Sequence, residues 1–367
     1  MLNKELYFVH LFNDFSGSPR VLRDAIDCEL THGDKKYLFT SGHKGFLTGV
    51  SCNVKTVPYK RSSNKLIVLF YFIYSQFYTF FALSYYLIRA KYNKRETQVV
   101  VNTILPFGAG LAGKFFATKV VWYVHEVAID PKPLDILLKA VLRFAANEVL
   151  FVSHYLQSKY PNLLCKQTVI FNGLRGDFPK KVKVDPRQKF DKKTVLFVGS
   201  LKSYKGIYSF VDLAESLPNL KFVAALNCTT DELSLLTHIP NNLELHVRPN
   251  YLEVLYKDAM LLVNLSKPTE WVETFGLTII EGFTFGCPAI IPPIGGPTEF
   301  TNSSNAIEVD SCDFQQLLVS VISVTSNYNV WLKMFRSANS AAKEFTTEQF
   351  QDRASPYFSI EKLRMFS

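Results

Sequence analysis

Short apolar runs alternate with helical stretches along this chain, and the alternation occurs in two sets. In the first set a helical stretch covers residues 21–30, and strand-like runs cover residues 6–11, 37–40, 99–102, 120–124 and 149–152. Strands of this length that alternate with helices predict a parallel sheet built from βαβ units. The first half of the chain is therefore expected to form an α/β domain.

The second set begins after a basic, proline-containing stretch at residues 179–193. A strand-like run at residues 194–198 leads through a glycine turn into a helix from about Ile207, and further runs follow at residues 222–226, 260–265 and 289–291. A chain of 367 residues is long enough for two domains. We predict an N-terminal domain at residues 1–178 and a C-terminal domain at residues 190–344.

The charge of the chain favours an anionic partner, and its cysteines favour a reducing compartment. A formal net charge of +9 suits nucleic acid, acidic lipid or nucleotide phosphates, and net charge alone does not choose among them. The six cysteines show no Cys-x-x-Cys spacing, and the N-terminal residues lack the apolar core of a signal peptide. These features predict a cytoplasmic protein with free thiols.

Two carboxylates, Glu273 and Glu281, are eight residues apart across the start of a probable helix. On a helix this separation is about 12 Å, so the two groups do not act on one atom. They could bind the two ends of an extended ligand while N–H groups at the helix start hold an anion between them, as a nucleotide diphosphate sugar would require. The alternative is a dipole-compensating carboxylate followed by a solvated one.

The wider segment, residues 265–300, resembles the Glu-x7-Glu signature of family 4 glycosyltransferases, which are retaining enzymes with the GT-B fold. The residues in register with that signature are Ser266, Glu273, Phe275, Gly276, Glu281, Gly286, Pro288, Gly295, Gly296 and Glu299. The resemblance implies two Rossmann-like domains that face a central cleft. It implies that Glu273 hydrogen-bonds hydroxyls of the donor sugar, that Glu281 binds the ribose, and that Thr274, Phe275 and Gly276 line the donor site.

A second turn, at residues 198–206, joins a strand to a helix and contains a lysine, which suits a diphosphate. It resembles the family's Gly-Arg-x4-Lys-Gly turn, with Lys205 in the lysine position and Ser200 in place of the arginine. The resemblance implies that Lys205 binds the diphosphate and that Lys202 substitutes for the missing arginine. Taken alone, the segment also fits an ordinary surface turn.

Three residues in two segments of the N-terminal half complete the predicted site. His125 follows a strand end, where open α/β sheets bind ligands, and it resembles the family's histidine beside the donor sugar. The alternative is a structural histidine. Gly17 and Ser18 resemble the family's paired glycines near the donor phosphates, although only one glycine is present.

Residues 66–88 contain no charged side chain and are rich in aromatic residues. A helix of this length spans about 35 Å, so a transmembrane helix, an ordinary domain helix and an interfacial helix all remain open. We favour docking at an anionic membrane surface, because cations flank the stretch on both sides: Lys60, Arg61 and Lys65 before it, and Arg89, Lys91, Lys94 and Arg95 after it.

Together the motifs imply a retaining hexosyltransferase of the bacterial surface-polysaccharide type, acting in lipopolysaccharide, O-antigen or capsule synthesis. The donor is a nucleotide-sugar and the acceptor a glycan or a polyprenyl- or lipid-linked glycan. The N-terminal domain binds the acceptor, and residues 345–367 return to pack on it. The sequence has no Asp-x-Asp pair to hold Mg²⁺ or Mn²⁺ against a diphosphate, so we expect no metal ion. We also expect no cofactor, no nucleic acid, and a peripheral location on the inner face of the plasma membrane. Two alternatives remain: a nucleotide-sugar 2-epimerase on the same fold, and a catalytically silent subunit that binds a membrane or a partner transferase.

Overall fold

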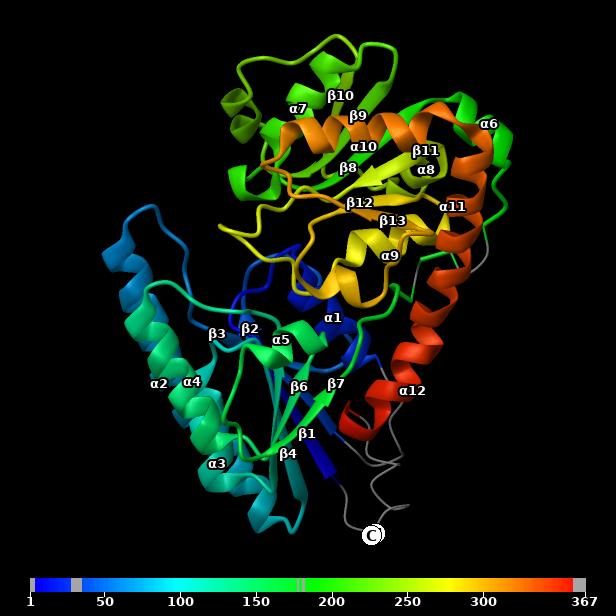
Figure 1. The fold of residues 1–367 in the computed structure, drawn as a ribbon. Coiled ribbons are helices and arrows are strands. Elements are labelled where there is room, and N and C mark those ends of the chain that lie inside the picture. The colour runs from blue at the N-terminus through cyan, green and yellow to red at the C-terminus, as the bar shows by residue number, and fades with distance from the viewer. Residues whose placement is uncertain (1–3, 28–34, 177, 180–181, 359–367) are drawn as a thin grey trace. The chain divides into compact units, whose positions relative to one another are not determined.

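The computed structural model describes residues 4–27, 35–176, 178–179 and 182–358. The chain forms two compact units, coloured along the sequence in Figure 1. Unit 1 runs to Asn172 and resumes at Thr347, and unit 2 comprises Gly173–Thr346. The basic stretch at residues 179–193 lies between the two sets of predicted strands, and its charge suggests a linker, but it belongs to unit 2 where it is described.

Unit 1 contains a seven-stranded parallel sheet in the order β3-β2-β1-β4-β5-β6-β7. The central strands β1, β4 and β5 consist almost wholly of buried residues, because helices cover both faces of the sheet. The strands are β1 (Lys4–Val9), β2 (Lys35–Ser41), β3 (Asn53–Val57), β4 (Glu96–Asn102), β5 (Lys119–Val124), β6 (Glu148–Phe151) and β7 (Lys166–Val169).

Helices α2, α3 and α4 lie side by side along one face of this sheet (Figure 1). Right-handed crossovers between parallel strands place α1 on the opposite face. There α1 packs against α12, whose Phe358 ring contacts Phe8 and Tyr123. The helices of unit 1 are α1 (Gly17–Ile26), α2 (Lys65–Tyr92), α3 (Phe107–Phe116), α4 (Lys132–Ala145), α5 (His154–Ser158) and α12 (Thr347–Phe358).

Unit 2 contains a six-stranded parallel sheet in the order β10-β9-β8-β11-β12-β13. Its strands are β8 (Thr194–Ser200), β9 (Lys221–Asn227), β10 (Leu243–Val247), β11 (Ala259–Val263), β12 (Ala289–Ile291) and β13 (Ala306–Glu308). Its helices are α6 (Pro186–Asp191), α7 (Ile207–Ser216), α8 (Leu252–Asp258), α9 (Leu277–Thr284), α10 (Phe314–Ser326) and α11 (Tyr328–Ala341), with short 3-10 helices η1 (Ser203–Lys205), η2 (Asp231–Leu235), η3 (Gly296–Glu299) and η4 (Ala342–Phe345). The predicted α/β class, with two parallel sheets, is confirmed.

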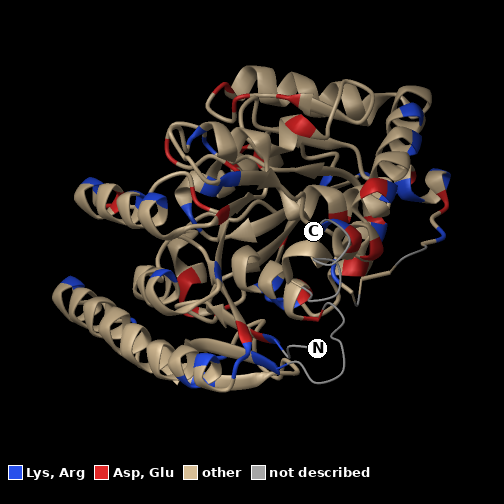
Figure 2. Cartoon of the chain, turned by 90° about the horizontal axis from the view of Figure 1, so that it is seen from below, with Lys and Arg blue, Asp and Glu red and all other residues tan. Residues whose placement is uncertain are grey.

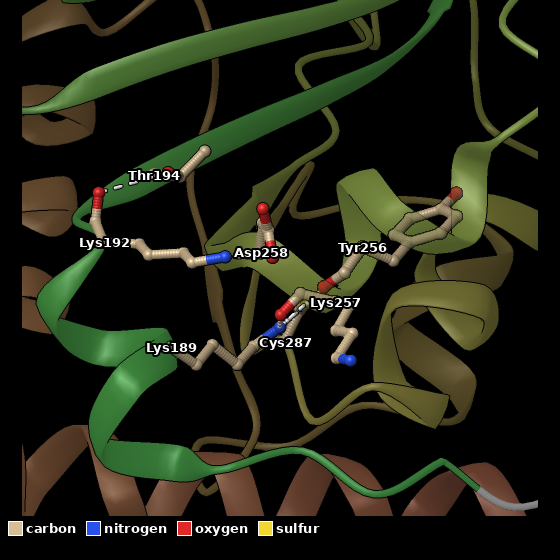
Figure 3. A network of polar contacts seen from close by, with 7 residues as sticks. All are labelled: Lys189, Lys192, Thr194, Tyr256, Lys257, Asp258 and Cys287. Atoms are coloured by element: carbon tan, nitrogen blue, oxygen red, sulfur yellow. Dashed lines mark hydrogen bonds and ion pairs between the residues drawn. The ribbon is translucent and has the colours of Figure 1, made fainter.

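Lys189 of α6 lies buried against the end of α8, although it comes from a stretch that reads as a charged linker. Its Nζ donates to the Tyr256 carbonyl at 2.6 Å and to the Lys257 carbonyl at 3.1 Å, and lies 3.3 Å from Cys287 Sγ (Figure 3). Carbonyls at a helix C-terminus lack helical partners, and a cation there is favourable. Burial lowers the pKa of Lys189. This contact fixes α6 to unit 2.

Helix α2 exposes an apolar face and buries a mixed one. Its buried residues are polar at Ser75, Gln76, Thr79 and Ser84 and apolar at Phe72, Leu83, Leu87 and Ala90. The Gln76 Oε1 atom accepts the backbone N–H of Gly108 at 3.0 Å. Its exposed face is apolar and consists of Leu66, Ile67, Leu69, Phe70, Ile73, Tyr74, Phe77, Tyr78, Phe81, Tyr85, Ile88 and Tyr92. A helix of a water-exposed domain normally shows the opposite arrangement.

By length and composition, α2 is the one helix of the described residues that could cross a membrane. The side of α2 that carries Gln76, however, packs against α3, where Gln76 accepts the Gly108 N–H. This side of the helix is therefore buried within unit 1. The apolar side remains exposed to the surroundings of the protein.

Candidate active site

The turn after β8 carries Lys205 and packs against the loop that follows β11. Gly206 has a φ of +82°, and a Cβ atom there would lie 2.2 Å from the Leu265 carbonyl oxygen. Only glycine fits such a conformation and such a close approach. The Lys267 N–H donates to the Tyr204 carbonyl at 2.8 Å, which joins the two segments again.

Lys205 and Glu273 meet where these segments join. The Lys205 Nζ lies 2.9 Å from Glu273 Oε2, with the two side chains 20% and 19% exposed. The ammonium also lies 5.4 Å from the centre of the Trp271 ring, and Trp271 stacks on Tyr204. Asn264 Nδ2 approaches the same carboxylate oxygen at 3.5 Å. Residues 68 positions apart thus form one charged cluster.

The pKa of Glu273 is set by two opposing influences. Burial by itself raises the pKa of this carboxyl, but the Lys205 ammonium and its hydrogen bond, with a further hydrogen bond from Asn264, lower it below the usual value. The carboxylate is therefore ionised at neutral pH. An ionised carboxylate accepts hydrogen bonds from hydroxyl groups, and the ammonium can bind an anion.

A pair of glycines explains how the loop that carries Glu273 keeps its shape. The Gly296 N–H donates to the Glu273 carbonyl at 2.9 Å. A Cβ atom at Gly296 would lie 2.0 Å from the Thr274 carbonyl oxygen, and one at Gly295 would lie 2.4 Å from that of Glu273. Side chains at either position would displace the backbone next to Glu273.

Helix α9 begins directly after the loop that carries Glu273. Gly276 precedes the helix with a φ of +93°, and no side chain of the described residues caps its first turn. Thr274 is half-buried, whereas Phe275 is buried and packs on Phe300 and Phe345. In this structure Phe275 is thus part of the core that supports the loop.

Glu281 and Lys202 contact residues outside the Lys205–Glu273 cluster. Glu281 is buried in α9, where its Oε2 accepts the Tyr256 hydroxyl at 2.7 Å. Lys202 is exposed and lies 3.5 Å from Glu232. The structure therefore brings Glu273 together with Lys205 and does not bring Lys202 to them.

In unit 1, His125 belongs to a network at the carboxyl ends of β1, β4 and β5. The buried Asn102 side chain lies 2.9 Å from His125 Nε2 through its Oδ1 atom, and 2.9 Å from His10 Nδ1 through its Nδ2 atom. The same Nδ2 atom donates to the Ser18 carbonyl at 3.2 Å. Gly17 and Ser18 are the first residues of α1. Asn102 thus links two segments that the sequence suggested separately.

No sequence motif marks Asn102, His10 or Glu126. The available signal is position, since each lies within two residues of the end of a buried strand, on the edge where open α/β sheets bind ligands. Glu126 Oε2 accepts the backbone N–H groups of Ile104 at 3.2 Å and His125 at 3.3 Å.

The titratable groups of this network have shifted pKa values. Burial lowers the pKa of His10 to about 4, and burial together with the nearby His10 lowers that of His125 to about 3. Both imidazoles are neutral at pH 7. Burial raises the pKa of Glu126 to about 7, against the effect of its backbone hydrogen bonds.

No three His, Cys, Asp or Glu side chains within residues 4–27, 35–176, 178–179 and 182–358 are placed to hold a metal ion. The positive groups of the unit 2 cluster are the Lys205 ammonium and the N–H groups that begin α9. This arrangement can bind an anion next to a hydroxyl-bearing group.

Residues 180–344 match the family model described as glycosyl transferases group 1. Among solved structures, HepE from Anabaena in complex with UDP and glucose is similar with a TM-score of 0.75 and 14% identity, covering 96% of this chain and 99% of that one. Sucrose-phosphate synthase from Thermosynechococcus elongatus also has a TM-score of 0.75 at 14% identity, with full coverage of both chains (100% and 100%).

The lipopolysaccharide outer core galactosyltransferase WaaB, in its apo form, has a TM-score of 0.63 at 14% identity, covering 95% of this chain and 97% of that one. No curated protein matches the sequence. At such identities the structural likeness shows the fold. The chain therefore has the GT-B glycosyltransferase fold, and most of its second unit matches the group 1 glycosyltransferase family model.

Proposed function

We propose that this protein is a retaining glycosyltransferase of family 4 that moves a hexosyl group from a nucleotide-sugar to a glycan acceptor. The observation that carries the proposal is the ion pair of Lys205 and Glu273 beside the first turn of α9. The group 1 family match over residues 180–344 and the UDP and UDP-glucose complexes of the similar HepE structures support a nucleotide-sugar donor.

In this mechanism Lys205 and the N–H groups of α9 stabilise the negative charge of the departing nucleoside diphosphate. Glu273 accepts hydrogen bonds from hydroxyls of the transferred sugar and orients its anomeric carbon. Retention requires that the acceptor oxygen bonds to the face that the diphosphate leaves. We assign no side chain as a nucleophile, and no metal ion or cofactor takes part.

A thermal-shift panel of UDP-, GDP-, dTDP- and CMP-sugars tests donor binding, because a ligand that binds the native state raises the melting temperature. We expect one nucleotide class to stabilise the protein, and Lys205→Ala to remove that shift. Glu232→Gln, which alters the exposed pair of Lys202, is the matched control and should keep the shift. A panel without any stabilising ligand would contradict the proposal.

Two alternatives predict different products. A nucleotide-sugar 2-epimerase on the same fold would change the sugar without an acceptor. A catalytically silent subunit would release no nucleoside diphosphate. A product with a new glycosidic bond, formed only when acceptor is present, distinguishes the transferase from both.

We further propose that the protein works on the cytoplasmic face of the plasma membrane with a lipid-linked acceptor, in surface-polysaccharide synthesis. The support is the exposed apolar side of α2, together with Phe115 of α3 and Ile136, Leu137 and Phe144 of α4, which are also exposed. Phe115 lies 6.3 Å from Phe144 between ring centres, so the exposed groups of α3 and α4 adjoin. We name these exposed apolar residues of α2, α3 and α4 the apolar face.

The charges around this face favour an anionic bilayer over a second protein copy. Helix α2 has no acidic residue, and its cations, Lys65, Arg89 and Lys91, lie at its ends. Figure 2 shows this long helix tan along most of its length and blue towards its ends. Each Lys or Arg near an anionic surface contributes about 1 kcal/mol, and two identical cationic rims would repel each other. The side of α2 that packs on α3 through Gln76 favours docking over a transmembrane span.

Sedimentation with phosphatidylglycerol and phosphatidylcholine vesicles tests the docking. We expect binding to the anionic vesicles, partial release by salt, and nearly complete release by alkaline carbonate. The combined Phe70→Ser, Phe77→Ser and Phe81→Ser variant should lose binding.

The matched control replaces Val319, Ile322 and Val330, which are exposed on unit 2, by serine and should bind as the parent does. Retention after carbonate would indicate a true span. A stable dimer that the phenylalanine variant dissociates would assign the face to a second copy instead.

A further inference from the structure

The side chain of Asn102 is bound at both ends, and one contact fixes its orientation. Asn102 is fully buried at the end of β4, and its Nδ2 atom faces the Ser18 backbone carbonyl at 3.2 Å. A carbonyl oxygen only accepts hydrogen bonds, so the group that faces it must be the NH2 end of the amide. The Oδ1 end then faces Nε2 of His125.

This orientation determines the tautomers of both neighbouring imidazoles. The NH2 group donates to Nδ1 of His10 at 2.9 Å, so that nitrogen carries a lone pair and His10 is protonated on Nε2. The Asn102 oxygen accepts from Nε2 of His125 at 2.9 Å, so Nε2 carries the proton there too. A neutral His125 therefore has an unprotonated Nδ1 that can only accept a hydrogen bond.

The surroundings keep His125 in this neutral form. Burial and the adjacent His10 disfavour a charged imidazole, and the pKa of His125 is about 3. His125 is half-buried, whereas Asn102 and His10 are buried. Among the described residues no hydrogen bond to His125 Nδ1 is found, which leaves this acceptor for a ligand. The complementary chemical class is a hydroxyl donor.

We propose that Asn102 is a positioning residue that fixes the tautomer of His125, so that His125 Nδ1 accepts a hydrogen bond from a sugar hydroxyl. The tautomer itself follows from the contacts of unit 1. The choice of a sugar as the hydroxyl donor rests on the proposed glycosyltransferase function. The network also ties the first turn of α1 to β4 through Ser18, so the same amide holds two neighbouring segments.

Nitrogen-15 NMR of histidine-labelled protein at neutral pH tests the tautomers without any substrate. Protonated and unprotonated ring nitrogens of a neutral imidazole have well-separated shifts, and His10→Gln and His125→Gln variants assign the signals. We expect the Nε2–H tautomer for both residues. Asn102→Ala should mix the tautomers of both. Asn102→Asp, which replaces the NH2 donor by an oxygen, should move a proton to His10 Nδ1 and leave His125 protonated on Nε2.

Asn172→Ala is the matched control. It removes another buried amide of unit 1, which accepts the Tyr123 hydroxyl at 2.9 Å. Tyr123 packs on the His125 ring, so the variant alters the same neighbourhood but neither imidazole's hydrogen bond to Asn102, and it should leave both tautomers unchanged. In a transfer assay Asn102→Ala should lower kcat/KM about tenfold, the effect of one hydrogen bond of ordinary strength.

An Nδ1–H tautomer of His125 in the parent protein, or unchanged tautomers in Asn102→Ala, would overturn the positioning role. Mixed tautomers with an unchanged kcat/KM would overturn the contact to sugar. Failure of the proposed function is recognised separately, because the parent protein would then transfer no sugar while the NMR result stands by itself.

Discussion

Lys205 and Glu273 form the pair on which the proposed chemistry depends, and two substitutions test it. Glu273→Gln keeps the shape of the side chain but removes its charge. We expect about a hundredfold lower turnover, because a charge-assisted hydrogen bond in an active site contributes about 2–4 kcal/mol. Lys205→Ala should act similarly through the leaving diphosphate, and steady-state kinetics measures both.

The exposed pair of Lys202 and Glu232 provides the comparison for that experiment. Its side chains are 51% and 37% exposed, and exposed pairs contribute little to stability. Glu232→Gln should therefore leave turnover near that of the parent. Equal losses in Glu232→Gln and Glu273→Gln would show that the Lys205 cluster has no special role.

Glu126 gives unit 1 a distinctive pH dependence of stability. Its pKa is about 7 in the folded protein and near the ordinary 4.5 when unfolded. Between these values the native state binds more protons than the unfolded state, so this group lowers stability as pH rises from about 4.5 to about 7. Above about 7 its contribution is constant.

Glu126→Gln should abolish this dependence, and urea denaturation at pH 5, 6, 7 and 8 measures it. His10 and His125 act in the opposite direction, because their lowered pKa values remove stability as pH falls below about 6.5. Their effect is present in both proteins and cancels in the difference. A difference in unfolding free energy that does not change between pH 5 and 7 would contradict the assignment.

Single residues differ in how far the sequence predicts them. Glu273 and Lys205 could be selected because each lies in a recognisable motif, although only the fold brings them to 2.9 Å. Lys189 could not be placed, because a lysine among lysines gives no sign of burial at a helix end. The role of Asn102 could not be predicted either, because its partners come from α1 and from the ends of β1 and β5, which are distant in sequence.

Among the elements, the central strands of each sheet can be predicted from the sequence and the edge strands cannot. The four strands absent from the sequence prediction, β3, β7, β10 and β13, are the edge strands of the two sheets. Edge strands are exposed on one side and carry polar residues, as in Lys166–Val169 with the sequence Lys-Gln-Thr-Val. Central strands are buried on both faces and show the continuous apolar runs that sequence reasoning recognises.

In helix α2, we expect substitution of a polar residue to cost more stability than substitution of the phenylalanine next to it. Gln76 is 3% exposed and accepts the Gly108 N–H, whereas Phe77 is 62% exposed. Gln76→Ala should therefore lower the unfolding free energy by about 1–3 kcal/mol, because a buried N–H loses its partner. Phe77→Ser should change it by about 0.5 kcal/mol or less. Urea denaturation without lipid measures both, and a reversed order would contradict the buried position of Gln76 and the exposed position of Phe77.

At the scale of the whole molecule, we expect transfer without a metal ion. The Lys205 ammonium and the start of α9 are the groups proposed to offset the charge of the leaving diphosphate. Activity should survive excess EDTA. Complete loss on chelation that Mn²⁺ restores would contradict this part of the mechanism.

The measurement that tests the central claim most directly is release of nucleoside diphosphate from a panel of nucleotide-sugars, with product analysed by NMR. We predict slow release from one donor class without acceptor and faster release with a glycan acceptor. The product should carry a glycosidic bond of the same anomeric configuration as the donor, and Glu273→Gln should suppress both rates. Inversion of the configuration, or no release from any donor in the panel, would contradict the account.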